Sequence, residues 1–241
     1  MLVVRTAIKS VTTARTVTLV IAHNVCKDLL PMVNNNYWVL YGQHTEPTFI
    51  ELSEPSQVKQ RSTALKYVKR WNNCIDIGSS VGMWTRELAS KFKKVYCFEP
   101  NPNFIECFNK NITENNVELF EYGLSDAEHT ASQGKQSTVL NNSPGNVICK
   151  TLDSFNLKDI DFIKIDVDGY EYKVLRGAIK TLRDNNPIIN IELKRDKRKE
   201  TARRCRKFLG KLGYTYIKRT RHDEIWLKIN ITTKFTNLIT K

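Results

Sequence analysis

The sequence lacks the features that define several common classes of protein. None of its six cysteines forms a CxxC pair or a cysteine–histidine cluster with the spacing of zinc ligands, so a metal site is not expected. The apolar run at 17–22 is too short for a membrane span, which needs about 20 residues, and its threonine-rich setting does not suit a signal peptide. With 7 prolines, 10 glycines and 41% hydrophobic residues, the chain resembles neither a fibrous nor a disordered protein. Its 241 residues fit one globular domain of ordinary size and an appended segment.

The cysteines also bear on the cellular compartment. Cys74 and Cys97 lie in apolar, strand-like runs, where a free thiol behaves as a small hydrophobic side chain. Free thiols are typical of a reducing compartment, so the sequence predicts a cytoplasmic protein.

Acidic residues are few relative to basic ones. The chain has 25 acids against 38 lysines and arginines, which gives a net charge of +13. Residues 195–221 hold twelve of these basic residues and two acids, so this segment alone carries a charge of +10. The segment could bind nucleic acid, anionic lipid or a phosphorylated substrate. The simpler interpretation is the solvated face of a helix.

The chain divides into an N-terminal extension at 1–55 and a main domain at 56–241. Within the extension, the stretch 37–52 is rich in aromatic and β-branched residues and is interrupted by glycine and proline, which predicts short strands. The main domain begins with a helix expected at 56–70, because its apolar positions have helical spacing.

From Trp71 onward, short buried runs alternate with helical stretches, which is typical of βα units and a mainly parallel sheet. The last two runs are separated by only four residues, so they should pair as an antiparallel hairpin. The sequence therefore predicts a Rossmann-like, doubly wound α/β fold with a mainly parallel seven-stranded sheet and an antiparallel terminal hairpin. The strands are expected at 74–77, 95–98, 117–122, 162–166, 188–192, 214–219 and 224–229, and the helices at 84–92, 103–115, 172–183 and 198–212.

The first motif is a glycine turn that follows the first strand of the main domain. Gly78 and Gly82 frame a GxxxG turn around Ser80, at the sheet edge where α/β proteins bind ligands. Asp76 precedes the turn, and its negative charge would repel the pyrophosphate of a dinucleotide. A carboxylate suits a ligand with an ammonium or sulfonium group, such as S-adenosylmethionine (AdoMet). On its own, the turn could be purely structural.

Two further motifs follow the next strands. Glu99, followed by Pro100 and Asn101, ends a strand 21 residues after Gly78, the position from which an acid accepts both ribose hydroxyls in nucleoside-binding folds. Ser125 and Asp126 form a loop after the third strand, where they could meet an adenine amino group or simply form a turn.

The fourth motif is a group of carboxylates at the ends of two buried strands. Asp166 and Asp168 surround the end of one strand, and Glu192 ends the next. Burying acids is costly, so such a group suggests a functional site. These three residues are the candidate catalytic groups, in that order, and a metal site made from them is the less favoured alternative.

The order of these motifs resembles the FkbM family of class I AdoMet-dependent methyltransferases over about residues 72–228. The resemblance also includes Thr151-Leu152-Asp153-Ser154-Phe155 and Val174-Leu175-Arg176-Gly177-Ala178. It implies O-methylation of a hydroxyl on a small molecule or a glycan. It further implies that Asp76, Gly78 and Gly82 hold the methionine end of AdoMet, that Glu99 holds the ribose and Ser125 with Asp126 the adenine, and that Asp166 lies beside the methyl group.

The sequence departs from the family pattern at two places and leaves other functions open. Ser79-Ser80 follows Gly78 where the family usually has Ala-Asn, and Asp168 replaces a usual glutamate; both changes keep the polarity. One alternative is RNA ribose 2′-O-methylation, with Asp166, Lys194 and Glu192 in a Lys-Asp-Lys-Glu-like arrangement. The other is a non-catalytic nucleic-acid-binding protein with a degenerate methyltransferase core.

Overall fold

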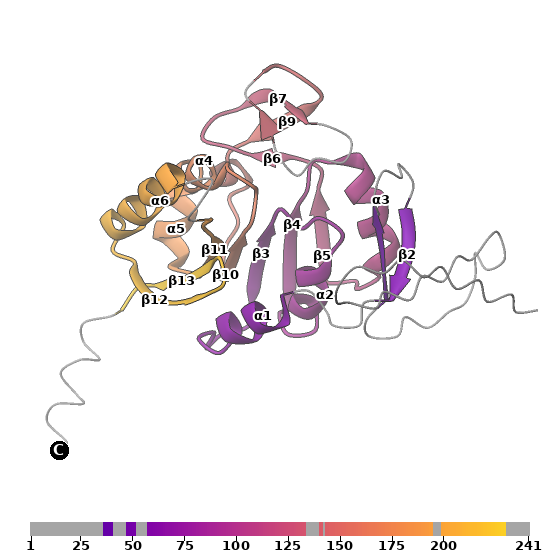
Figure 1. Ribbon diagram of the computed structural model, residues 1–241. Helices are drawn as coiled ribbons and strands as arrows, with labels where there is room; N and C mark the ends of the chain where they lie inside the picture. The colour runs from indigo at the N-terminus through magenta and orange to yellow at the C-terminus, as the bar shows by residue number, and fades with distance from the viewer. Residues whose placement is uncertain are drawn as a thin grey trace, which may run out of the picture.

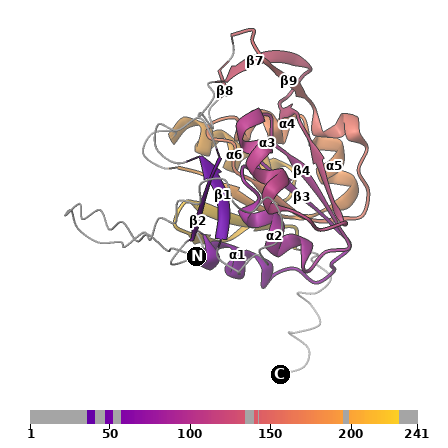
Figure 2. The same cartoon turned by 90° about the vertical axis from the view of Figure 1, so that its right-hand side faces the viewer.

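The computed structural model describes residues 36–40, 47–51, 57–133, 140–141, 143–194 and 199–229. In the N-terminal extension, β1 (Asn36–Leu40) and β2 (Pro47–Glu51) form an antiparallel pair, within the stretch expected to contain strands. This pair runs alongside a helix of the main domain, α3 (Pro102–Asn111) (Figures 1 and 2).

The centre of the molecule is a seven-stranded sheet with the order β12-β13-β11-β10-β3-β4-β5. Within this sheet β3, β4, β5, β10 and β11 are parallel, and the terminal strand β13 pairs antiparallel with both β11 and β12, so the predicted fold class is confirmed. The strands are β3 (Asn73–Ile77), β4 (Lys94–Phe98), β5 (Val117–Phe120), β10 (Ile160–Ile165), β11 (Ile188–Glu192), β12 (Thr215–Thr220) and β13 (Asp223–Leu227).

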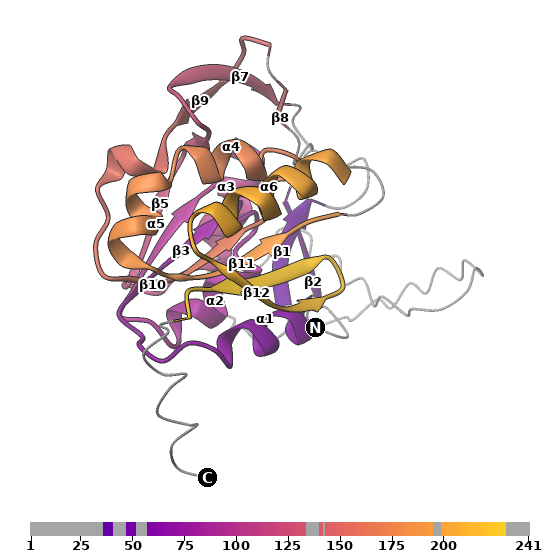
Figure 3. The same ribbon diagram turned by 90° about the vertical axis from the view of Figure 1, so that its left-hand side faces the viewer.

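Helices cover both faces of this sheet, because alternate residues of each strand point to opposite sides. On β3, Ile75 and Ile77 pack in the core under the C-terminal helices, and Cys74 packs in the core under the N-terminal helices. One layer is α1 (Val58–Leu65), α2 (Met83–Ala89) and α3. The other is α4 (Glu171–Arg176), α5 (Ile179–Asn185) and α6 (Lys199–Lys211), which lie together over the sheet in Figure 3.

The single helix expected at 172–183 is wrong, because the structure has two helices, α4 and α5, with a break at Gly177. A Cβ atom on Gly177 would overlap the carbonyl oxygen of Ser125, so the chain passes that loop too closely for any side chain. The helix expected at 103–115 ends sooner, at Asn111, since Ile112 is already extended. The helices expected at 56–70 and 84–92 are also shorter, at Val58–Leu65 and Met83–Ala89.

A small four-stranded sheet in the order β6-β9-β7-β8, not predicted from the sequence, lies above the central sheet in Figure 1. Its strands are two to five residues long, which is too short for the alternation that marks a half-buried strand to stand out. They are β6 (Gly123–Leu124), β7 (His129–Gln133), β8 (Leu140–Asn141) and β9 (Val147–Lys150).

Two observations concern the expected compartment. In the described part of the chain, the cysteines are free and buried. Across the same residues, every helix is too short or too polar to cross a bilayer.

Candidate functional site

The main cleft lies where the path of the chain through the sheet reverses direction. From β3 the chain proceeds outward through β4 and β5, and it then returns to place β10 on the other side of β3. Ligands of open α/β sheets bind outside the carboxyl ends of the strands at such a point. The cleft here has a volume of about 210 Å³ and is lined by the loops after β3, β4 and β10, with Gln57 before α1 and parts of the small sheet.

The glycine turn after β3 forms the floor of the cleft. Gly78 has a positive φ of 74°, and a Cβ atom there would overlap the carbonyl oxygen of Asp166, so only glycine lets β3 and β10 approach this closely. The backbone N–H of Gly78 donates to the carbonyl of Phe98 at 2.9 Å. Ser79 lines the cleft, and its buried Oγ has no hydrogen-bond partner among the described residues.

Glu99 lines the cleft at the end of β4. Its Oε2 accepts the backbone N–H of Ser80 at 2.9 Å, and its Oε1 accepts that of Asn101 at 3.0 Å. Burial raises the pKa of Glu99 to about 7, against the opposing effect of these two hydrogen bonds. Each carboxylate oxygen keeps a lone pair for a further donor, so the group can still accept two hydroxyls of a ligand.

The candidate catalytic carboxylates lie at the carboxyl ends of β10 and β11. Asp166 and Asp168 line the cleft, whereas Glu192 lies beside it. Lys194 binds two of the three, with its Nζ 2.7 Å from Oδ1 of Asp168 and 2.9 Å from Oε2 of Glu192. The side chain of Asp166 has no hydrogen bond or ion pair to any described residue, so Asp166 is the carboxylate still available to a substrate.

The charges around Lys194 also shift its pKa and that of Glu192. Burial, followed by the charge of Asp166, raises the pKa of Glu192 to about 7. Burial favours the neutral form of Lys194, but its hydrogen bonds to the two carboxylates outweigh this effect and raise its pKa. Among the described residues, no group of three or more His, Cys, Asp or Glu side chains is arranged to hold a metal ion.

Several residues expected to contact the cofactor lie outside the cleft lining. Asp76 is fully buried beneath the glycine turn, where Thr85 donates to its Oδ2 at 2.7 Å and Lys164 lies 3.2 Å from its Oδ1. A direct contact between Asp76 and the methionine end of AdoMet is therefore no longer expected. Gly82, with φ 90°, is the N-cap residue just before α2, and a Cβ atom there would collide with Ile112.

The remaining residues outside the lining have local structural contacts. The side chain of Asn101 caps α3 by accepting the N–H of Asn103 at 3.0 Å. Ser125 is buried and lies 3.3 Å from the carboxylate of Asp126, which in turn lies 3.4 Å from Arg176. Neither Ser125 nor Asp126 lines the cleft, so the adenine contact expected of them is not supported by their positions.

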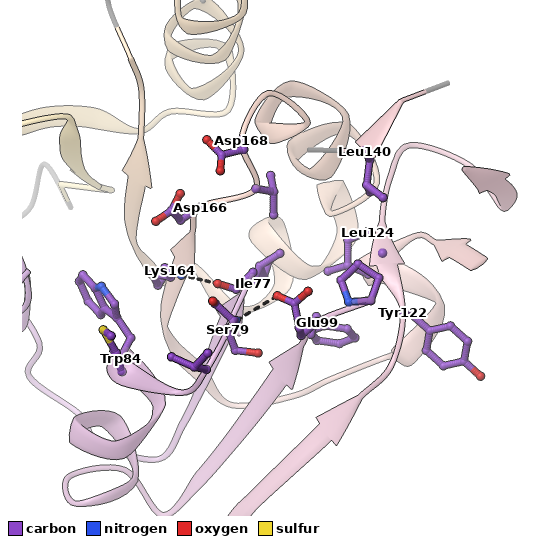
Figure 4. A pocket seen from close by; sticks show the side chains of 18 of the residues that line it. Ile77, Ser79, Trp84, Glu99, Tyr122, Leu124, Leu140, Lys164, Asp166 and Asp168 are labelled. Atoms are coloured by element: carbon purple, nitrogen blue, oxygen red, sulfur yellow. Dashed lines mark hydrogen bonds between the residues drawn. The ribbon is translucent and has the colours of Figure 1, made fainter. Parts of the chain in front are cut away.

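The cleft combines predicted residues, such as Glu99 and Asp166, with others that were not expected from the sequence. Figure 4 shows Trp84, Lys164 and Asp166 on one side of the glycine turn, and Glu99, Tyr122, Leu124 and Leu140 on the other. Lys164 had a signal in the sequence, because a lysine between two isoleucines in a buried strand requires a partner. Tyr122, Leu124, Leu140 and Gln133 belong to the overlooked small sheet or its approach, and nothing in their sequence marked them.

The cleft fits a nucleoside with a positively charged tail. The side with Glu99 combines a carboxylate for ribose hydroxyls with the apolar side chains of Phe98, Leu124 and Leu140, which suit a flat base. Next to it, the Oγ of Ser79 is a buried polar group without a partner, and the free carboxylate of Asp166 adds a negative charge to the cleft that favours a cationic ligand. This combination of fold and cleft defines the class of Rossmann-like, AdoMet-binding methyltransferases.

Comparison with known families identifies the particular family. The Methyltransferase FkbM domain matches residues 76–216, more than half of the chain, so the protein belongs to the FkbM family. The match confirms the predicted family and its cofactor, AdoMet.

Two relatives give the match more detail. The curated "Hexuronic acid methyltransferase AglP" of Haloferax volcanii is 27% identical over 127 residues, which cover 47% of this chain and 53% of that protein. The crystal structure of Methyltransferase FkbM from Methylobacillus flagellatus KT has a TM-score of 0.51 at 16% identity and covers 72% of this chain and 50% of that chain. The second likeness concerns the fold alone. The chain spans about half the length of each of these relatives.

Proposed function

We propose that the protein transfers the methyl group of AdoMet to a hydroxyl group of a small molecule or sugar. AdoMet supplies an electrophilic methyl group on a sulfonium centre. Glu99 accepts the ribose hydroxyls, the glycine turn supports the methionine end, and Asp166 faces the acceptor. The hydroxyl oxygen forms the new C–O bond as the C–S bond breaks, Asp166 receives the hydroxyl proton, and S-adenosylhomocysteine leaves with the sulfur electron pair.

The observation that carries this proposal is the free carboxylate of Asp166 at the edge of a nucleoside-shaped cleft. A neutral hydroxyl needs a base in the transition state, and a carboxylate within reach of the reacting oxygen can serve as one. A carboxylate acceptor needs no base, and the acidic groups Asp166, Asp168 and Glu192 would disfavour its approach. The name of the Haloferax relative supports a sugar acceptor.

RNA ribose methylation is the second candidate, because α6 carries much of the basic segment. In that candidate Lys194 would act at the reacting hydroxyl, and a lysine can accept a proton only after it has lost its own. Since Asp168 and Glu192 raise the pKa of Lys194, the structure favours Asp166 as the base. A non-catalytic role is less favoured, because the cleft retains the residues that suit AdoMet.

The test is a transfer assay with labelled AdoMet against hexoses, hexuronic acids and a short RNA. Alkali distinguishes the products, since a methyl ester is cleaved and a methyl ether is not. We expect an alkali-stable methyl ether on a sugar. Exclusive formation of a methyl ester, or of methylated RNA, would replace the proposed acceptor. Absence of S-adenosylhomocysteine binding in isothermal titration would overturn the proposed activity itself.

The proposed reaction is metal independent. The ammonium group of Lys194 already occupies the space between Asp168 and Glu192 that a cation would use. Transfer should therefore continue in the presence of a chelator. Complete loss of transfer that magnesium restores would instead favour a metal held by the carboxylates.

A further inference from the structure

Lys164 is a buried lysine that the proposed reaction does not use. Its side chain is 5% exposed, and its Nζ lies 3.2 Å from Oδ1 of the fully buried Asp76. The same Nζ donates to the carbonyl oxygen of Gly78 at 2.7 Å, as Figure 4 shows. Asp76 is held in turn by the hydroxyl of Thr85 on α2. A polar chain of contacts therefore runs from α2 through β3 and β10 to the floor of the cleft.

The stability of the fold does not explain this ion pair. Removing two charges from water costs about as much as their attraction returns, and a well-packed apolar pair often stabilises a core as well. Burial favours the neutral form of Lys164, but Asp76 and Asp166 outweigh it and raise its pKa, so the group remains charged. The contact that an apolar pair could not replace is the hydrogen bond to Gly78.

This hydrogen bond is one of those that hold the glycine turn in place. The N–H of Gly78 is held by Phe98 of β4, and its carbonyl is held by Lys164 of β10, so the two neighbours of β3 fix both polar groups of the peptide backbone there. Two residues later, the N–H of Ser80 donates to Glu99. A shift of Gly78 would therefore move the ribose-binding carboxylate as well as the floor of the cleft.

We infer that Lys164 is a positioning residue of the AdoMet cleft, which acts from beneath the floor by holding the Gly78 carbonyl, with Asp76 as its counter-ion. The role concerns cofactor binding and does not depend on which acceptor the enzyme uses. It is separate from the direct cofactor contact that the sequence suggested for Asp76.

Three variants separate positioning from charge balance. Lys164→Met removes the donor to Gly78 and leaves Asp76 buried without its counter-ion. Asp76→Asn keeps the donor and removes the counter-ion. The double variant removes both charges, which restores the charge balance but not the donor. Lys94→Met is the matched control, because it removes an ion pair with Glu118 at the opposite end of β4.

Two measurements read out the role: the dissociation constant of S-adenosylhomocysteine by titration, and the amide hydrogen exchange of residues 78–82 in the free protein. Lys164→Met should raise the dissociation constant by about 10- to 100-fold, the scale of one hydrogen bond to a charged group, and should accelerate exchange in the turn. Asp76→Asn should have a smaller effect, and Lys94→Met none. In the double variant, the melting temperature should recover relative to Lys164→Met while the dissociation constant stays raised.

A purely structural role gives a different pattern. If affinity recovers together with the melting temperature in the double variant, or if exchange at 78–82 is unchanged when Lys164 is replaced, the inference is wrong. The exchange measurement needs no ligand, so it decides the inference even if the proposed methyl transfer fails. If Lys164→Met does not fold, the double variant still gives both measurements.

Discussion

At the scale of single residues, the three carboxylates beside the cleft differ in how strongly their neighbours hold them. Asp168 and Glu192 share the ammonium group of Lys194, and Asp166 has no partner of this kind among the described residues. A base must be free to receive a proton when the acceptor arrives, so this difference ranks Asp166 first.

Replacing Asp166 with asparagine should therefore remove most of the turnover and little else. The amide keeps the shape of the side chain and cannot accept the hydroxyl proton, so kcat should fall by about 10²- to 10⁴-fold, the usual contribution of a general base. The affinity for S-adenosylhomocysteine and the melting temperature should stay unchanged. Asp168→Asn is the comparison, with a smaller expected loss. A rate near that of the unchanged protein for Asp166→Asn would show that Asp166 is structural.

The raised pKa of Glu99 leads us to expect that cofactor binding depends on pH. In the proposed binding mode, ribose hydroxyls would donate to the ionised carboxylate, and burial raises the pKa of this group to about 7 in the free protein. Binding should thus be strongest above pH 7 and weaken as the pH falls through 7, because the carboxyl group must first release its proton. Titrations with S-adenosylhomocysteine between pH 5.5 and 8.5, an interval chosen to span the pKa of about 7, measure this.

Glu99→Gln provides the control for that pH dependence. This variant should bind about 10- to 100-fold more weakly, the scale of a lost charged hydrogen bond, with a flat pH profile over the same interval. An unchanged dissociation constant would remove Glu99 from the ribose site. An unchanged slope with pH would assign the titration to another group.

At the scale of secondary-structure elements, the sequence predicted what depends on periodicity and missed what depends on contacts. The buried strands β3, β4, β10 and β11 are short, mainly apolar runs between helical stretches, and they were found within one or two residues. The break at Gly177 depends on the Ser125 carbonyl, which is distant in the chain, so no local pattern reveals it. The small sheet was missed because its strands are too short to show a clear alternation.

The same distinction, between local sequence pattern and distant contacts, applies to the residues of the candidate site. Glu99 and Asp166 were predictable because a carboxylate at the end of a buried strand is costly unless it is used. The position of Asp76 was not, since its contact with Lys164 depends on which strands are neighbours and on their register. Before β10 is known to pair with β3, Asp76 looks like any other acid ahead of a glycine turn.

Two glycines test the role of the break between α4 and α5. Gly177→Ala places a Cβ atom against the Ser125 carbonyl, so it should lower the free energy of unfolding by about 1 to 3 kcal/mol, the usual cost of overpacking. Gly210→Ala in α6 meets no atom within 4 Å and should raise the same free energy by about 0.5 to 1 kcal/mol. Urea denaturation measures both. Equal effects of the two substitutions would contradict the close approach at Gly177.

At the scale of the whole molecule, most of the net charge of +13 comes from the segment 195–221, which carries +10. Within the described part of the basic segment, Arg203 pairs with Glu200, and Arg206 pairs with the buried Glu224. Lys207 and Lys211 line a shallow groove on α6 and form no ion pair with a described residue. Both are therefore available to a polyanion and are not needed for the fold.

Charge reversal at these two lysines should separate the acceptor classes. Lys207→Glu with Lys211→Glu should change the free energy of unfolding by less than about 0.5 kcal/mol and leave S-adenosylhomocysteine binding intact, since both side chains are on the surface. Methyl transfer to a sugar should be insensitive to the reversal and to salt. RNA binding would instead weaken with salt. For each tenfold rise in salt concentration, the log of the binding constant should fall by about 0.7 to 0.9 per phosphate neutralised. Methylation of RNA that is lost with the reversal and with salt would overturn the sugar acceptor.

The pairing of β3 with β10 has a consequence for the chain as it is being synthesised. The glycine turn and Glu99 leave the ribosome well before Asp166, and Lys164 is 86 residues beyond the carbonyl that it holds. A nascent chain that ends before β10 lacks Lys164, Asp166 and Asp168 of the cleft lining. Its Trp84 also lacks the ring of Phe162, against which it stacks at 6.3 Å in the finished protein. AdoMet therefore meets the complete cleft only in molecules in which both halves of the sheet have already met.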